Sequence, residues 1–189
     1  MRRLLCLFLV LLFLPVVSLA SSASPDYEPA LKMNMSTFVT KYNALGSSLS
    51  SSLLPLEKPF QWSTYDKYRV AWFNTDKKSG VKILLLSADP KAGVGLDAGI
   101  DIIQIYMEKP ADFLSFVTIA VRCSQLFSSE LFGSSLAPLA VADIMSYYYE
   151  NSTGSYYAYR SLDSENIYAL MFFMDHDSYY FEICPRGDL

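Results

Sequence analysis

The first twenty residues constrain this chain most, because they read as a leader that takes no part in the mature fold. The basic residues Arg2 and Arg3 precede an unbroken apolar run over 4–14, and the small residue Ala20 stands just before the expected cut. A basic start, an apolar run and a small-residue end together define a secretory signal peptide. We therefore expect residues 1–20 to be removed on export, which makes the protein secreted or periplasmic.

Two alternatives concern how this leader is processed. An uncleaved signal anchor would have to span the bilayer with residues 4–20, a stretch at the lower length limit for a helical span that also contains Pro15. A second possible cut follows Ala23. No later stretch has the length of an uncharged apolar span, so we predict no membrane span after cleavage.

Charge and composition exclude several classes of protein. The chain has 189 residues, of which 52% are hydrophobic and 18% are charged, and this composition is typical of a globular domain and not of a disordered chain. Loss of the leader removes two of the 15 basic residues and none of the 19 acidic ones, so the net charge becomes −6. An acidic chain without a basic stripe is a poor candidate for binding nucleic acid.

We predict one structured domain with short flanking segments. After the signal peptide, 1–20, comes a small-residue and polar stretch that indicates a mobile N-terminal tail over 21–35. A single domain then occupies 36–185, and 186–189 form a C-terminal tail. A domain of this size can bury enough apolar surface to fold without a metal or dense cross-linking.

The spacing of apolar residues predicts an α+β domain with a mainly antiparallel sheet and helices packed on one face, in the order α-β-β-β-β-α-α-β-β-β. Alternation marks strands, apolar residues at helical spacing mark helices, and short polar turns between strands favour antiparallel pairing. The expected elements are a helix over 36–46, strands over 60–64, 67–73, 81–87 and 100–108, helices over 112–127 and 136–149, and strands over 157–160, 168–174 and 178–184.

Cys123 and Cys184 are the two cysteines that remain after the leader is removed. An even pair in an exported chain predicts a disulfide, which would tie a buried helix to the last strand. The alternative is a pair of buried thiols that act as small apolar side chains. A catalytic role for Cys123 is disfavoured because an apolar helix raises the pKa of a thiol.

Tyrosine is concentrated near the C-terminus, where nine of the 14 tyrosines lie between Tyr147 and Tyr180. Tyrosine combines rigid contact area with a polar end, which suits a surface that binds a sugar, peptide or protein. We predict Tyr157 and Tyr159, which share one strand face, as the first candidates for such a surface. The alternative is that a strong β-former simply fills half-exposed strand positions.

No catalytic, metal or cofactor motif stands out. The single histidine, His176, is flanked by two aspartates in a polar turn, and no spacing supplies the further ligands of a zinc site. Two glycosylation sequons begin at Asn34 and Asn151, and an Arg-Gly-Asp tripeptide occupies 186–188. None of these short motifs specifies a function by itself.

The sequence therefore favours an exported, non-catalytic binding protein that uses no cofactor. Its expected partner is a protein, a peptide or an envelope glycan, met through a tyrosine-rich sheet face. The alternative is a secreted hydrolase with an unidentified carboxylate site, since acidic residues are common in the chain and nothing singles out a pair.

Overall fold

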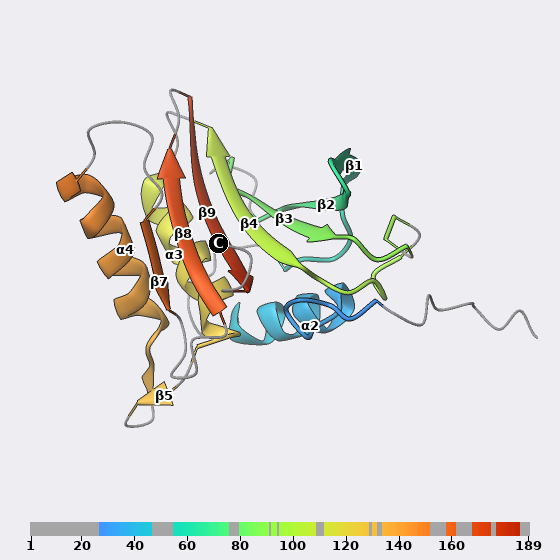
Figure 1. Ribbon diagram of the computed structural model, residues 1–189, viewed down its shortest axis with the longest axis horizontal. Helices are drawn as coiled ribbons and strands as arrows, with labels where there is room; N and C mark the ends of the chain where they lie inside the picture. The colour runs from blue at the N-terminus through green and yellow to red at the C-terminus, as the bar shows by residue number, and fades with distance from the viewer. Residues whose placement is uncertain are drawn as a thin grey trace, which may run out of the picture.

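A seven-stranded antiparallel sheet forms the centre of the protein, and the three helices of the described residues lie against it (Figure 1). The structure is a computed structural model. It describes residues 27–46, 55–75, 80–90, 92–93, 95–108, 112–128, 130–131, 134–151, 158–161, 168–174 and 177–185. The predicted signal peptide, 1–20, and the predicted C-terminal tail, 186–189, lie outside these residues.

The elements follow one another along the chain in the predicted order. The helices are α2 (Met35–Gly46), α3 (Phe113–Gln125) and α4 (Ala137–Asn151). The strands of the large sheet are β1 (Gln61–Tyr65), β2 (Tyr68–Asn74), β3 (Lys82–Ser87), β4 (Ile102–Glu108), β7 (Ala158–Ser161), β8 (Tyr168–Met174) and β9 (Ser178–Pro185). A small hairpin that we did not predict, β5 (Glu130–Leu131) with β6 (Ser134–Ser135), separates α3 from α4.

The strand order across the sheet is β1-β2-β3-β4-β9-β8-β7, and every pair is antiparallel. The first four strands form a meander, because each of them pairs with the next one along the chain. The last strand, β9, enters the centre of the sheet between β4 and β8, so the two halves of the chain share one sheet. This arrangement confirms the predicted α+β class.

The helices pack on one face of the sheet, which confirms the second part of the fold prediction. Strand residues of odd number on β2, β3, β4 and β9 turn toward the helices, because side chains alternate between the faces of a sheet. They form one buried cluster with apolar residues of all three helices: Ala71, Phe73, Ile83, Leu85, Ile103, Ile105, Phe181 and Ile183 from strands, with Phe38, Tyr42, Phe116, Ile119, Val141 and Ile144 from helices.

Polar side chains fix where the helices begin. Asp112 caps α3 by accepting hydrogen bonds from the backbone N–H groups of Leu114 and Ser115. Because the carboxylate of Asp112 receives these bonds, its pKa lies below the usual value, with the Ser115 hydroxyl as the largest cause. At α2 the cap is Asn34, whose Oδ1 accepts from Thr37 N at 2.8 Å. The first sequon residue is therefore part of a helix cap.

The prediction of a mobile tail as far as residue 35 is wrong for residues 27–35. Leu31 and Met35 are buried in the helix-side core, and backbone hydrogen bonds join this segment to residues 96–100. The contact is close at Gly99, where an added Cβ would lie only 2.3 Å from Pro29 Cγ. The segment is held by partners about 70 residues away, which local composition does not reveal.

Among the helices of the described segments, none combines the length and the apolar character that a bilayer crossing demands.

Candidate functional site

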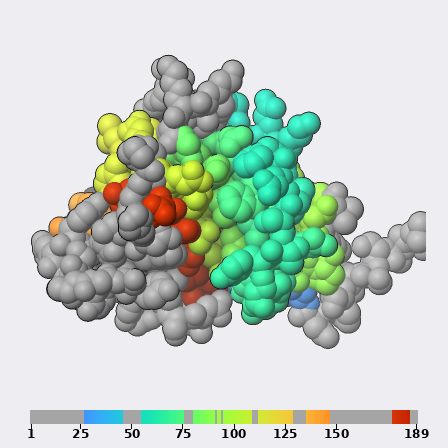
Figure 2. Space-filling model, turned by 90° about the horizontal axis from the view of Figure 1, so that it is seen from above, coloured from blue at the N-terminus to red at the C-terminus, as the bar shows by residue number. Residues whose placement is uncertain are grey.

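The sheet face opposite the helices carries a groove of about 750 Å³. Its floor is aliphatic and is formed by Val70, Leu84, Leu86 and Ile102. Its walls are aromatic and are formed by Tyr65, Tyr68, Trp72, Tyr106 and Tyr180. Figure 2 shows the teal residues of β1 and β2 beside the green residues of β3 and β4, with red residues of β9 on their other side. No described helix covers this face.

One row of paired residues crosses the whole sheet through the groove. Pairing by register runs from strand to strand in the order Gln61, Trp72, Leu84, Gln104, Glu182, Met171 and Tyr159. Residues paired directly across strands share a face of the sheet. The row therefore assigns Glu182 and Trp72, which come from strands far apart in the sequence, to the same surface.

Among the described residues that line the groove, Glu182 is the one acidic side chain. Its Oε1 accepts a hydrogen bond of 2.6 Å from Nε2 of Gln104, its cross-strand partner. Burial raises the pKa of the Glu182 carboxyl, and the hydrogen bond from Gln104 offsets part of that rise. A carboxyl with a raised pKa on an apolar surface is typical of a functional site.

The raised pKa has a consequence for stability. The folded protein holds the Glu182 proton more tightly than the unfolded chain does. The free energy of unfolding therefore falls as pH rises from the pKa of Glu182 in the unfolded chain to its higher pKa in the folded protein. Glu182→Gln should therefore raise the unfolding midpoint at about pH 7 and change it little at about pH 3. Thermal unfolding followed by circular dichroism at both pH values measures this, and an equal gain at both would contradict the assignment.

The aromatic walls lie at different angles to one another. The rings of Tyr106 and Tyr180 are 5.3 Å apart at 49°, and those of Trp72 and Tyr106 are 6.3 Å apart at 80°. Trp72 is fixed by a hydrogen bond of 2.7 Å from its Nε1 to Ser63 Oγ. At one end of the cluster the Lys82 ammonium lies 5.4 Å from the centre of the Tyr106 ring. The Trp72 wall is thus held by a hydrogen bond, and the Tyr106 wall already lies next to the Lys82 cation.

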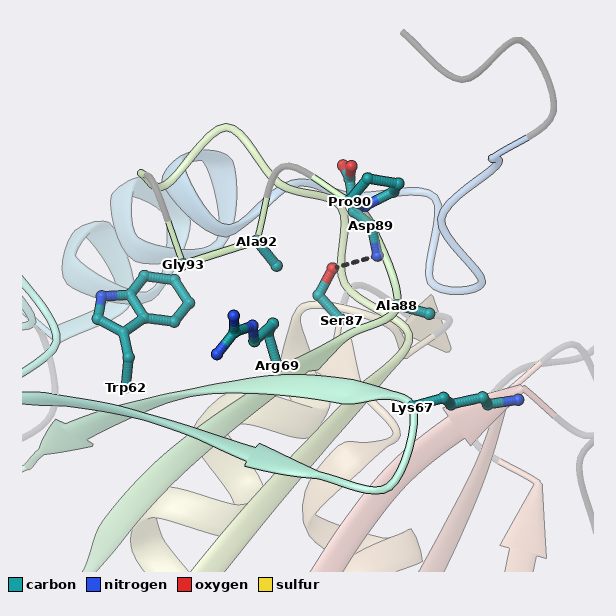
Figure 3. Close-up of a pocket in the computed structure, with 9 residues that line it drawn as sticks. All are labelled: Trp62, Lys67, Arg69, Ser87, Ala88, Asp89, Pro90, Ala92 and Gly93. Carbon is teal, nitrogen blue, oxygen red and sulfur yellow. Dashed lines mark hydrogen bonds between the residues drawn. The ribbon is translucent and has the colours of Figure 1, made fainter.

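A smaller and more polar pocket of about 380 Å³ lies at the end of β1, β2 and β3, under the loop that follows β3 (Figure 3). Arg69 points into it and donates to Thr64 Oγ1 at 2.9 Å. Lys67 points away from the other lining side chains. Asp89, also in the lining, accepts a hydrogen bond of 3.2 Å from Gly99 N and supplies a negative charge. This mixed charge and these internal contacts make the pocket a weaker candidate than the groove.

The predicted disulfide does not form in the structure, in which Cys123 and Cys184 are both buried and no disulfide joins them. Cys123 belongs to the helix-side core, whereas Cys184 follows Glu182 at a spacing of two on β9 and so faces the opposite side of the sheet. A disulfide requires Cα atoms within about 7 Å and Cβ atoms that face each other, and the sheet lies between these two side chains. Burial also raises the pKa of the Cys123 thiol, which agrees with the expectation that this cysteine is not a nucleophile.

The tyrosine surface of Tyr157 and Tyr159 stays a prediction. Tyr159 lies on β7 at the end of the row that contains Glu182, while Tyr157 lies outside the described residues. His176 and the tripeptide over 186–188 also lie outside them. Among the residues that are described, no three His, Cys, Asp or Glu side chains gather as a metal site would need.

The sequence reasoning missed the groove itself. Trp72, Tyr106 and Glu182 occupy alternating strand positions, so their shared face was readable once the strands were paired. The pairing of β4 with β9 was the missing information. Comparison of the chain with known proteins finds no match to a family model, to a curated protein or to a solved structure.

Proposed function

We propose that this is an exported binding protein whose ligand lies in the groove on the helix-free face of the sheet. The observation that carries the proposal is the composition of the groove, an aliphatic floor and aromatic walls with few other polar side chains, namely Ser63, Thr64, Gln104 and Glu182. Binding sites for small ligands have this character, with volumes of about 300–1,000 Å³ and few polar groups that fix orientation. The groove volume of about 750 Å³ falls within that range.

The partner classes expected from the sequence are compatible with this groove. Tryptophan and tyrosine rings pack against sugars and against peptide side chains. A volume of about 750 Å³ suits a small molecule or a short piece of a peptide or glycan chain. The hydrolase alternative gains less support, because retaining and inverting glycosidases use two carboxyl groups and, of the residues described, Glu182 alone supplies one to the groove lining.

Export is the other half of the proposal, and its support is the leader over 1–20. We expect the protein recovered from the extracytoplasmic fraction to have the mass of residues 21–189, with a minor product of a cut after Ala23. Full-length protein confined to the cytosol would contradict export.

The same mass measurement reports on the two cysteines. Iodoacetamide should add no mass to the native protein and two adducts after unfolding, because Cys123 and Cys184 are buried thiols.

The neutral apolar dye Nile red tests the groove. Fluorescence titration should show that Trp72→Ala weakens dye binding by about tenfold, since it removes one wall of the groove. Tyr65→Ala should weaken binding severalfold without loss of stability, because Tyr65 is 71% exposed at the rim. Leu114→Ala is the matched control, because this side chain is 74% exposed but lies on α3. Equal losses in the control, or no dye uptake, would contradict groove binding.

A further inference from the structure

We propose that the groove selects a small organic amine, a protonated nitrogen attached to an apolar chain or ring. This inference rests on the proposed function, because the amine would occupy the same groove. It goes further in naming the chemistry of the ligand and the residue that recognises it. Glu182 would pair with the cation, and the walls and floor would hold its apolar body.

The first argument is charge complementarity. Thirteen of the residues that the structure describes line the groove, and among them Glu182 is acidic while none is Lys, Arg or His. The nearby ammonium of Lys82 is paired with Glu108 at 3.9 Å and lies at the end of the aromatic cluster. The described lining of the groove therefore presents one carboxyl group among side chains that are mostly apolar and aromatic. A ligand that matches it carries one positive charge on an apolar body.

The second argument comes from the hydrogen bonds of Glu182. Its Oε1 receives the bond from Gln104, and Oε2 accepts no hydrogen bond from any described residue. Because burial disfavours the ionised carboxyl, a cation that pairs with it relieves a cost that the free protein bears. Charge-assisted hydrogen bonds are also stronger than neutral ones. The free protein thus holds an acceptor in position for a protonated nitrogen.

The third argument comes from the aromatic walls. Cations are attracted to the faces of tryptophan and tyrosine rings within about 6 Å of the ring centre. The protein already uses this contact, since the Lys82 ammonium lies 5.9 Å from the centre of Trp72 and 5.4 Å from that of Tyr106. Tyr180 extends the cluster toward Glu182, two residues along β9. A ligand cation bound at Glu182 would lie beside the same kind of rings.

Three probes with the same apolar tail test the inference. Octylamine is protonated at about pH 7, 1-octanol is neutral and octanoate is negatively charged. Trp62→Phe leaves Trp72 as the single tryptophan of the two in the chain, so its fluorescence reports on the groove wall. We expect octylamine to bind at least about tenfold more tightly than 1-octanol, and octanoate to bind most weakly.

Glu182→Gln identifies the recognising group. This variant should bind octylamine no more tightly than 1-octanol while its affinity for 1-octanol stays the same. Glu57→Gln is the matched control, since it makes the same change of charge at an exposed residue outside the groove. Thermal unfolding confirms that both variants fold, and the preference for octylamine should be retained in the control.

The other possible results of the binding experiment contradict different parts of the proposal. Equal binding of octylamine and 1-octanol by the parent protein would overturn selection of a cation and leave groove binding standing. Absence of binding by all three probes would overturn the proposed function as well. If the capped peptide Leu-Lys-Leu binds more tightly than octylamine, the cation belongs to a peptide, and the choice of a small molecule is wrong.

Discussion

Asp101→Ala is expected to lower the free energy of unfolding by roughly 3 kcal/mol, which corresponds to a fall of about 10 °C in the unfolding midpoint. The carboxylate of Asp101 is 7% exposed and accepts hydrogen bonds from three donors. Ala88 N donates to Oδ2 at 2.6 Å, Ala30 N to Oδ1 at 3.1 Å, and the Tyr27 hydroxyl lies 3.0 Å from Oδ1. Alanine would leave these donors without their acceptor.

Two further variants make this prediction specific. Tyr27→Phe removes one donor and should cost about 1 kcal/mol. Asp101→Asn should lower the free energy of unfolding nearly as much as the alanine variant does. Both carboxylate oxygens accept from backbone N–H groups, and asparagine would replace one of these oxygens by an NH2 group, which donates and cannot accept. Chemical denaturation measures all three. A loss below about 1 kcal/mol for Asp101→Ala would show that the N-terminal segment is held mainly by its apolar contacts.

Arg122→Ala should destabilise the protein by a similar amount, roughly 3 kcal/mol. Arg122 is 2% exposed, and its Nε and Nη2 donate to the carbonyl oxygen of Tyr42 at 3.0 and 2.6 Å. Its guanidinium lies 3.9 Å from the centre of the Tyr42 ring. The side chain thus joins α3 to α2, and alanine would remove both the hydrogen bonds and the packing of the long stem.

Arg122→Met separates these two contributions. Methionine retains most of the volume and removes a buried charge, and among the described residues no carboxylate forms an ion pair with Arg122. Burying a charge costs free energy, and the methionine variant no longer bears that cost. We therefore expect the free energy of unfolding to fall by only about 1 kcal/mol. Denaturation curves of both variants provide the comparison. Equal losses would show that the hydrogen bonds to Tyr42 dominate, contrary to the packing argument.

The strand positions were predictable because the patterns that mark them, an alternation of apolar and polar residues or a short apolar run, lie within a few consecutive residues. The expected strands over 168–174 and 178–184 coincide with β8 and β9 to within one residue. The helix that begins after Asp112 was equally predictable, since an N-cap and an apolar stripe lie in one short segment. These features depend on neighbours in the sequence and need no knowledge of which strands pair.

The errors concern contacts between distant parts of the chain. The packing of residues 27–35 depends on Asp101 and on the loop before it, so a polar, proline-containing stretch resembled a mobile tail. The disulfide was inferred from the number of cysteines, although Ile183 and Cys184 necessarily face opposite sides of one strand. Glu182 resembled an ordinary polar position until β9 was paired with β4.

Successive strand side chains face opposite sides of the sheet, so Phe181 belongs to the core beneath the helices and Glu182 to the groove. The two faces of the sheet therefore serve different purposes, packing on one side and the proposed binding on the other. Substitutions at even-numbered positions of β2, β3, β4 and β9 alter the groove while the interior beneath the helices keeps its shape. Ligand preference can therefore diverge without a matching change in the scaffold. For protein engineering, the same property offers a compact set of sites at which new recognition can be introduced.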